Sequence, residues 1–471
     1  MNETGSISTS TMPITPKALV RVGMVNLGCA KNLVDAEVML GSVKARGMEV
    51  TANAADADVM VINTCAFIDA AKEESIEAIL DAHAQREALR PDQKLIVSGC
   101  MSQRYAEELH QQMPEVDLFI GLDQVKELGY IVEGLLAKTG TVNARGGDLV
   151  FQQSRPTYIP DYDTPRFRLT PSHSAYLKIA EGCNHPCSFC VIPQMRGKHR
   201  SRSPSSVISE IRALVSEGVR EINLISQDTT YYGMDLWTQK AGPRQPVDSS
   251  RGPTLASLLE QIESVDGEFW IRLLYTHPAH WSAELMNTIS QCSKVARYID
   301  MPLQHIHEEM LGRMRRETSR SHIERVIEDL RAAIPGVALR TTFIVGFPGE
   351  TDAEFESLLQ FIERTRFERL GIFKYSREEG SRAARMPNQV DQKTKNLRYR
   401  RAMALQQRIA FELAQARVGR QLKLLVDEPF VARSEFDAPD VDTRVVLNEA
   451  APVGEFIVRK ITGYRGYDLV A

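Results

Sequence analysis

Residues 176–190 read Tyr176-Leu-Lys-Ile-Ala-Glu-Gly-Cys183-Asn-His-Pro-Cys187-Ser-Phe-Cys190, which is a short apolar strand followed by three cysteines. Three thiolates within eight residues can surround one soft metal centre, because thiolates favour zinc or iron–sulfur clusters. A structural zinc site normally takes four protein ligands, whereas three cysteines leave one iron of a 4Fe-4S cluster open. The spacing therefore predicts a 4Fe-4S cluster on Cys183, Cys187 and Cys190. The alternative is a zinc site completed by His185 or by a distant ligand.

Five further apolar runs follow this strand, and helical patterns separate them. Such alternation predicts six βα units and a parallel sheet curled into a partial or complete barrel. The expected strands are residues 176–179, 221–225, 269–274, 296–301, 338–345 and 369–375, with helices such as 204–217, 319–333 and 352–365. Between them lies a polar insertion, residues 237–253, which we expect to run over the surface.

Upstream of this region, one unit occurs three times: a short apolar run, a turn that carries a cysteine and an amphipathic helix. The runs are residues 22–27, 59–62 and 95–97, and they precede Cys29, Cys65 and Cys100. Parallel strands with right-handed crossovers would place all three cysteines at the carboxyl edge of one sheet, where α/β sheets bind ligands. Each cysteine alone is typical of a protein core, but the repeated placement predicts a second three-thiolate cluster. Cys292 has no such neighbours and is expected to be structural.

Residues 139–174 are rich in glycine, proline and polar side chains, and we expect them to form a linker. After the sixth unit, a long basic helix over residues 392–417 leads to a tail of short strands and turns. The expected strands of the tail are residues 421–427, 430–432, 443–447 and 455–461, which favour a small β-barrel. Residues 421–471 carry six Lys and Arg against nine Asp and Glu, a net charge of −3.

The composition is that of a soluble globular protein, with 43% hydrophobic and 25% charged residues. No apolar run is long enough to span a membrane and the first twenty residues do not resemble a signal peptide, so we expect a cytoplasmic protein without membrane association. Seven cysteines, an odd number, argue against a disulfide framework there. A net charge of −4 excludes a global positive field for nucleic acid.

Two three-cysteine sites in this order resemble the radical S-adenosylmethionine (SAM) methylthiotransferases along nearly the whole chain. In the N-terminal part the resemblance rests on Asn26-Leu-Gly-Cys29-Ala-Lys-Asn32, Asn63-Thr-Cys65-Ala-Phe67 and Ser98-Gly-Cys100-Met-Ser-Gln103. It implies an α/β fold of three parts. These are an N-terminal parallel α/β methylthiotransferase domain over residues 20–136, a radical SAM (β/α) partial TIM-like barrel over 169–406, and a TRAM domain, a small OB-like β-barrel, over 409–471.

The resemblance also implies the cofactors, which are two 4Fe-4S clusters and S-adenosylmethionine. The open iron of the core cluster would chelate SAM, and electron transfer would release a 5′-deoxyadenosyl radical that abstracts hydrogen from an unactivated carbon. The N-terminal cluster would supply sulfur and a second SAM the methyl group, so no catalytic residue beyond the clusters is expected. Side chains expected to bind the cofactor at the barrel mouth are Phe189, Gln227, Gln304, Gly346 and Glu350. Residues 350–352 also fit the start of a helix.

Two branches of this family differ in substrate. One methylthiolates a modified adenosine in transfer RNA, and the other the β-carbon of an aspartate in the twelfth protein of the small ribosomal subunit. An RNA-binding barrel should be basic, because phosphate contacts dominate its affinity, whereas this tail is acidic. It concentrates Glu435, Asp437, Asp440 and Asp442 in one stretch, which suits a basic protein.

Residues 297–305 and 432–442 also look like the aspartate-modifying branch. We therefore expect that ribosomal protein as the substrate, free or within the ribosomal particle, and an electron donor such as a flavodoxin or ferredoxin. The alternatives are the transfer RNA enzyme, a non-catalytic iron–sulfur carrier and a zinc-stabilised RNA-binding protein. The basic run over residues 196–202 is either a solvated face or a contact for an anionic substrate segment or the cofactor carboxylate.

Overall fold

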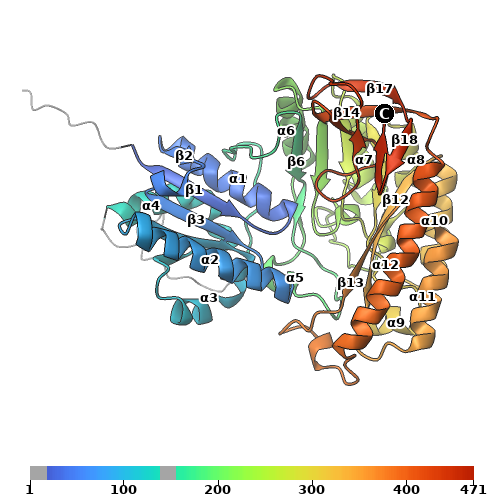
Figure 1. Ribbon diagram of the computed structural model, residues 1–471, viewed down its shortest axis with the longest axis horizontal. Coiled ribbons are helices and arrows are strands. Elements are labelled where there is room, and N and C mark those ends of the chain that lie inside the picture. The colour runs from blue at the N-terminus through green and yellow to red at the C-terminus, as the bar shows by residue number, and fades with distance from the viewer. Residues whose placement is uncertain (1–18, 138–154) are drawn as a thin grey trace, which may run out of the picture.

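The computed structural model describes residues 19–137 and 155–471, which form three main sheets with helices packed around them (Figure 1). The N-terminal part lies on one side of the molecule, and the tail packs against the middle part, away from the N-terminal part. The predicted linker falls partly outside the described residues, and its described portion, residues 155–173, contains no helix or strand. None of the described helices has the length and hydropathy of a membrane-spanning segment.

The N-terminal sheet has five strands, all parallel, in the order β2-β1-β3-β4-β5. Its strands are β1 (Arg21–Asn26), β2 (Glu49–Thr51), β3 (Val59–Thr64), β4 (Lys94–Gly99) and β5 (Leu118–Phe119), and its helices are α1 (Ala30–Ala45), η1 (Ala54–Asp56), α2 (Asp69–Leu89), α3 (Cys100–Gln112), η2 (Leu122–Glu127) and α4 (Leu128–Leu136). The three predicted strands are confirmed as β1, β3 and β4. β2 and β5 were not predicted, because strands of three and two residues show too little alternation to be detected in the sequence.

The middle sheet contains the six predicted strands, all parallel, in the order β13-β12-β11-β10-β9-β6. They are β6 (Ser174–Lys178), β9 (Glu221–Ile225), β10 (Trp270–Leu273), β11 (Val295–Asp300), β12 (Ala338–Val345) and β13 (Arg369–Lys374). The sheet ends at β6 and β13, so it is a partial barrel rather than a closed ring of eight strands.

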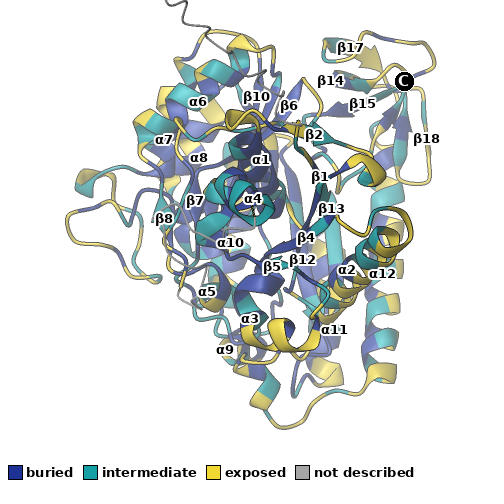
Figure 2. Ribbon diagram, turned by 90° about the vertical axis from the view of Figure 1, so that its left-hand side faces the viewer, coloured by how far each residue is buried: buried dark blue, intermediate teal, exposed yellow. Residues whose placement is uncertain are grey.

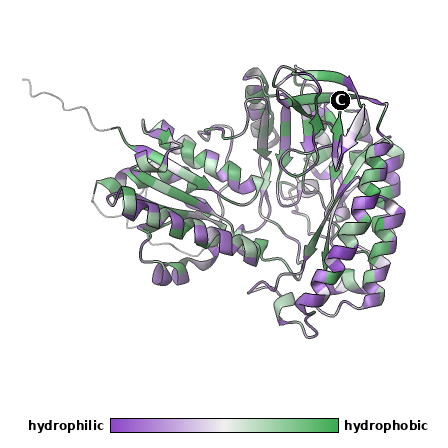
Figure 3. Cartoon of the chain, viewed as in Figure 1, coloured by the Kyte–Doolittle hydropathy of each residue, from purple (hydrophilic) through white to green (hydrophobic). Residues whose placement is uncertain are grey.

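Helices cover the outer face of this sheet, and a short antiparallel pair follows β6. The outer helices are α6 (Pro204–Ser216), α7 (Leu255–Glu263), α8 (Ala283–Gln291), α9 (Glu308–Met314), α10 (Arg320–Ala333) and α11 (Asp352–Thr365); the pair is β7 (Ala180–Glu181) and β8 (Arg200–Ser201), flanking α5 (Ile192–Met195); single turns are η3 (Thr229–Tyr231), η4 (Ser249–Arg251), η5 (Pro278–His280) and η6 (Ala383–Arg385). The strands are largely buried while the outer helices alternate in burial and hydropathy (Figures 2 and 3), as expected for a parallel sheet covered by amphipathic helices.

The prediction that residues 237–253 run over the surface is wrong at their start. Trp237 is buried, and it packs with Tyr231, Met234 and Ala241 in a small apolar cluster. Its indole Nε1 donates a hydrogen bond to the carbonyl of Pro253 (2.9 Å), so the insertion closes around the tryptophan. One buried aromatic anchors a segment whose average polarity suggests a surface loop.

The long predicted helix is α12 (Gln392–Gln415), and it leads into the six-stranded sheet of the tail. The strands of the tail are β14 (Gln421–Glu428), β15 (Val431–Ser434), β16 (Val445–Val446), β17 (Phe456–Lys460), β18 (Gly463–Arg465) and β19 (Asp468–Val470), in the order β17-β14-β15-β16-β19-β18. Four of them match the prediction, and all pairs but β16–β19 are antiparallel.

The tail is joined to the barrel by a buried ion network around Glu221, the first residue of β9. Its carboxylate pairs with Arg272 of β10 (2.8 Å) and with Arg433 of β15 (2.7 Å). Burial raises the pKa of Glu221, but the two guanidinium groups outweigh this effect and lower it to about 2. The network therefore holds one carboxylate ionised between the two sheets.

The loop between β15 and β16 lies against the amino end of the barrel, and the prediction that this stretch is an acidic docking face is wrong. Asp437 pairs with Arg369, the first residue of β13, and Asp442 lies 3.6 Å from Arg340 of β12. Other contacts of the stretch are Tyr176 Oη to Asp440 (2.8 Å), Tyr298 Oη to Asp442 (2.6 Å) and the Arg297 amide to Glu435 (3.2 Å). The carboxylates of this loop thus contact residues of the barrel. A count of charges in the sequence cannot tell such internal contacts from charges on a free surface.

We predict that Glu221→Gln lowers the stability of the folded chain by about 3 kcal/mol, because it leaves Arg272 buried without a counter-ion and removes one of the carboxylates that pair with Arg433, which keeps Asp427. Denaturant unfolding measures the effect. Because the folded pKa of Glu221 is depressed, the lost stability is present in the parent above pH 4.5 and fades as the pH falls toward 2.

The matched control is Glu268→Gln, since the exposed Glu268 also bridges to the tail, through Lys423 (2.8 Å). We expect a nearly unchanged midpoint for this variant. An equal loss of unfolding free energy in Glu221→Gln and Glu268→Gln at neutral pH would contradict the role given to Glu221.

Candidate functional site

The three N-terminal cysteines lie at one sheet edge, because each follows a strand of the same parallel sheet. Cys29 precedes α1, Cys65 follows β3, and Cys100 is the first residue of α3. The turns approach closely: a Cβ on Gly28, whose φ is +88°, would lie 2.8 Å from Cβ of Cys65. Asn32 of α1 ties the turns together by donating to the carbonyls of Leu27 (2.9 Å) and Thr64 (2.8 Å).

The electrostatics of this edge fit a metal centre. Burial raises the pKa of Cys100 to about 12, and the nearby Cys65 and Cys29 add to the shift. Cys29 is more exposed; desolvation by the surrounding atoms acts in the same direction, but Lys31 and Arg196 outweigh it and lower the pKa of Cys29. Clustered thiolates repel one another unless a cation joins them, and these three cysteines could hold the predicted cluster.

The second set, Cys183, Cys187 and Cys190, lies in the loop after β7. Each sulfur lies within hydrogen-bond distance of an N–H donor: the His185 amide at 3.4 Å from Cys183, the Ile192 amide at 3.5 Å from Cys190, and Arg316 at 3.4 Å from Cys187. Burial and the neighbouring Cys187 raise the pKa of Cys190 to about 12. Donors directed at sulfur favour thiolates, so this loop also fits an iron–sulfur cluster.

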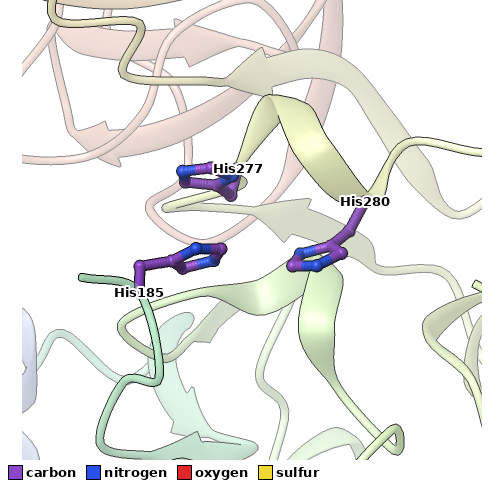
Figure 4. Close-up of side chains that lie close together, drawn as sticks. All are labelled: His185, His277 and His280. Atoms are coloured by element: carbon purple, nitrogen blue, oxygen red, sulfur yellow. The ribbon is translucent and has the colours of Figure 1, made fainter. Parts of the chain in front are cut away.

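Three buried histidines lie beside this loop, and Figure 4 shows His185, His277 and His280 close together. The rings of His185 and His277 are stacked, with centroids 3.8 Å apart and planes 15° apart. Donor atoms of all three lie within 4.8 Å of one another, yet stacked rings do not direct their in-plane lone pairs at a common point.

His185 is fully occupied by carboxylates, which disfavours the zinc alternative. Its Nε2 lies 2.8 Å from Asp228 and its Nδ1 2.8 Å from Glu317. Burial lowers the pKa of His185, but these two hydrogen bonds outweigh it and raise the pKa to about 9, so the charged ring donates to both. A histidine with both nitrogens donating cannot complete a thiolate site.

Near the core cysteines, Gln227 and His277 each have a buried polar atom with no hydrogen-bond partner among the described residues, Gln227 Oε1 and His277 Nε2. Gln227 donates through its amide nitrogen to Glu181, directly before the cysteine loop. The Nδ1 of His277 accepts from the Ala279 amide (3.2 Å), which leaves Nε2 as the proton-bearing nitrogen. A free acceptor and a free donor fit a polar cofactor such as SAM, because buried polar groups are normally paired.

The other residues predicted for the cofactor lie around the same barrel, with partners of their own. Phe189 packs in the apolar cluster of Met310, Phe347 and Tyr375. Gln304, with φ +72°, joins β12 through its backbone. Gly346 donates its amide to Glu350, whose buried carboxylate also meets His305 (3.2 Å) and Arg398 (2.7 Å).

The backbone conformation and the close packing at Gly346 require a glycine. Its φ is +74°, and a Cβ there would lie 2.3 Å from the side chain of Lys395. Helix α11 begins after Thr351, which accepts a hydrogen bond from the Glu354 amide, as the helix-start interpretation predicts. A role of these residues toward the cofactor stays a prediction.

In the basic run over residues 196–202, Arg196 and Arg202 are buried and Lys198 is exposed, so the run is not a continuous solvated face. Arg196 is buried, and its guanidinium donates to Asp35 (3.0 Å), Glu181 (3.1 Å), Asn32 (2.8 Å) and Cys100 Sγ (3.3 Å). Burial lowers the pKa of Arg196, but the anions around it reverse the shift. The side chain therefore links the loop of the core cysteines to the N-terminal cysteine edge.

Lys31 is a further cation at this junction that the sequence analysis missed. It lies two residues after Cys29, is buried, and has its Nζ 2.8 Å from the centroid of the Tyr275 ring. Tyr275 follows β10 and has φ +62°, a strained value for a tyrosine. Burial lowers the pKa of Lys31 to about 8, and the nearby Cys29 opposes the shift. The sequence signal that could have indicated this part of the barrel mouth is Thr276-His-Pro-Ala-His280, which follows a predicted strand.

Three family descriptions match the chain in succession. Residues 21–121 match the uncharacterized protein family UPF0004, residues 177–362 the radical SAM superfamily, and residues 418–471 the TRAM domain. Among solved structures, the radical SAM methyltransferase TsrM from Kitasatospora setae is similar in fold, with a TM-score of 0.53 at 14% identity over 76% of this chain and 73% of that chain.

Curated relatives match over almost the full length. The ribosomal protein uS12 methylthiotransferase RimO of Opitutus terrae is 57% identical over 96% of both chains. The protein of the same name from Akkermansia muciniphila is 52% identical over 98% of this chain and all of its own. The chain therefore belongs to the RimO family of radical SAM methylthiotransferases, whose cofactors are 4Fe-4S clusters and S-adenosylmethionine.

Proposed function

We propose that this protein methylthiolates the β-carbon of an aspartate in ribosomal protein uS12. The observation that carries the proposal is the buried contact in which Arg196 joins the two three-cysteine sites. The substrate follows from the relatives, which are named for uS12. We assign the N-terminal domain to residues 20–136, the radical SAM core to 169–406 and the TRAM domain to 409–471, in a cytoplasmic protein that draws electrons from a flavodoxin or ferredoxin.

In this proposal, Cys183, Cys187 and Cys190 hold the core cluster, and Cys29, Cys65 and Cys100 hold the auxiliary cluster. When bound, the core cluster and SAM supply one-electron chemistry and the auxiliary site supplies sulfur. Gln227 and His277 would bind polar groups of SAM through their unpaired atoms. A role for Phe189, Gln304, Gly346 and Glu350 in shaping the same pocket remains part of the proposal.

Buried ion pairs fix the position of the two cysteine sites relative to each other. Asp35 of α1 and Glu181 of β7 both contact Arg196 and Lys178, so two anions and two cations are buried together across the interface. Because removal of one buried partner leaves an uncompensated charge, the network resists separation of the sites. A carrier that only delivers clusters has no need for such a contact between them.

We predict that replacing Cys183, Cys187 and Cys190 with alanine removes about half of the reconstituted iron, and that replacing Cys29, Cys65 and Cys100 removes the other half. Iron analysis and Mössbauer spectroscopy measure the loss. Cys292→Ala is the matched control, because Cys292 is buried in the apolar core away from both sets, and it should retain all of the iron. An iron–sulfur cluster that remains unchanged in both triple variants would contradict the assignment of the two clusters to these cysteines.

The substrate is tested by competition. Reconstituted enzyme receives SAM, a strong reductant, unmodified uS12 and bulk transfer RNA, and both products are read by mass spectrometry. We expect a methylthio mass gain on an aspartate of uS12 and none on transfer RNA. A gain on adenosine alone would replace the proposed substrate with the alternative one, and SAM that leaves the spectrum of the reduced core cluster unchanged would indicate a carrier.

A further inference from the structure

We propose that the Lys31 ammonium binds the side-chain carboxylate of the substrate aspartate and thereby selects aspartate at the site. This inference rests on the proposed function and adds a substrate-binding residue to it. Lys31 belongs to neither cysteine set, and no step of the chemistry described above uses it. Lys31 is buried between the two cysteine sites, and no described carboxylate pairs with it.

The ammonium of Lys31 is buried, the Cys29 thiol lies nearby, and none of the described carboxylates pairs with the ammonium. The residue is 7% exposed, and among residues 19–137 and 155–471 its Nζ makes no salt bridge or hydrogen bond. The face of the Tyr275 ring offers a cation–π contact, which replaces only part of the lost hydration. Buried charges are normally paired, so a buried ammonium with no carboxylate against it can accept one from a ligand.

The neighbouring carboxylates cannot supply that anion, because each already has its own cations or donors. Glu181 is held by Lys178 (2.7 Å) and Arg196 (3.1 Å). Asp300 is held by Arg340 (2.8 Å) and accepts the Tyr275 amide (3.0 Å). Asp35 is paired to the same two cations as Glu181, so each of these carboxylates has another cation, and Lys31 shares its charge only with the nearby Cys29 thiol.

The Lys31 ammonium lies between the two cysteine sites, where the proposed function places the reacting carbon. Lys31 is the second residue of α1, close to Cys29, and Tyr275 follows the carboxyl end of β10, so the ammonium lies between the N-terminal cysteine edge and the barrel mouth. In aspartate the β-carbon is directly bonded to the carboxylate carbon. A carboxylate held by Lys31 therefore brings that carbon beside the auxiliary site, and a charge-assisted contact gives both energy and orientation.

The test compares binding of two substrates, and it needs no turnover. Fluorescence anisotropy measures the Kd of reconstituted enzyme, without reductant, for labelled uS12 and for uS12 in which the target aspartate is replaced by asparagine. We expect the parent to prefer the aspartate form by about tenfold or more, Lys31→Met to bind both forms alike, and Lys31→Arg to keep the preference. The control is Lys44→Met, an exposed lysine in the last turn of the same helix, which should behave as the parent.

A role of Lys31 in the electrostatics of the auxiliary cluster would change turnover on both substrates equally and would leave the binding preference intact. A preference for aspartate that persists in Lys31→Met, with iron content equal to the parent, overturns the inference. The failure of the proposed function looks different, because the parent enzyme itself would then leave uS12 unmodified in the competition experiment.

Discussion

The guanidinium of Arg196 is the contact on which the rest of the site depends. It is buried between two parts of the chain that are far apart in sequence, and it contacts a thiol, two carboxylates and an amide at once. Because Arg196 lies six residues after Cys190, the loop that carries the core cysteines also fixes the distance to the N-terminal edge. Apolar packing supports the contact, since Val191 and Met195 of this loop belong to the core of the N-terminal part.

The fold could be predicted from the sequence wherever a pattern was long. All six strands of the barrel and the three cysteine-bearing strands show apolar runs of parallel type, and the cysteine turns follow them directly. Strands of two or three residues, such as β2, β5, β18 and β19, were missed because so few residues show no period. Buried Trp237 was missed because one anchor residue does not alter the average polarity of its segment.

The site was predicted only in part, because charge partners depend on the tertiary structure. Cysteine spacing pointed to both three-thiol sets, since the ligands come from short motifs. The partners of Arg196 and of Asp437 lie 161 and 68 residues away along the chain, for example Asp35 and Arg369. A run of basic or acidic residues therefore looks alike in sequence whether it faces water or a buried counter-charge. Unpaired atoms such as Gln227 Oε1 can be recognised only after every partner is known.

The network of Glu221, Arg272 and Arg433 makes the tail a structural part of the barrel rather than a separate module. A module attached by a flexible tether can be removed or exchanged without harm to its neighbour, but this one supplies the counter-charge for a residue inside the barrel. A chain shortened before β14 would expose the amino end of the barrel and leave Arg369 and Arg340 without carboxylates from the tail. The TRAM domain thus closes the amino end of the barrel. Its deletion would disturb the barrel itself, so a loss of activity in such a variant would not measure substrate affinity.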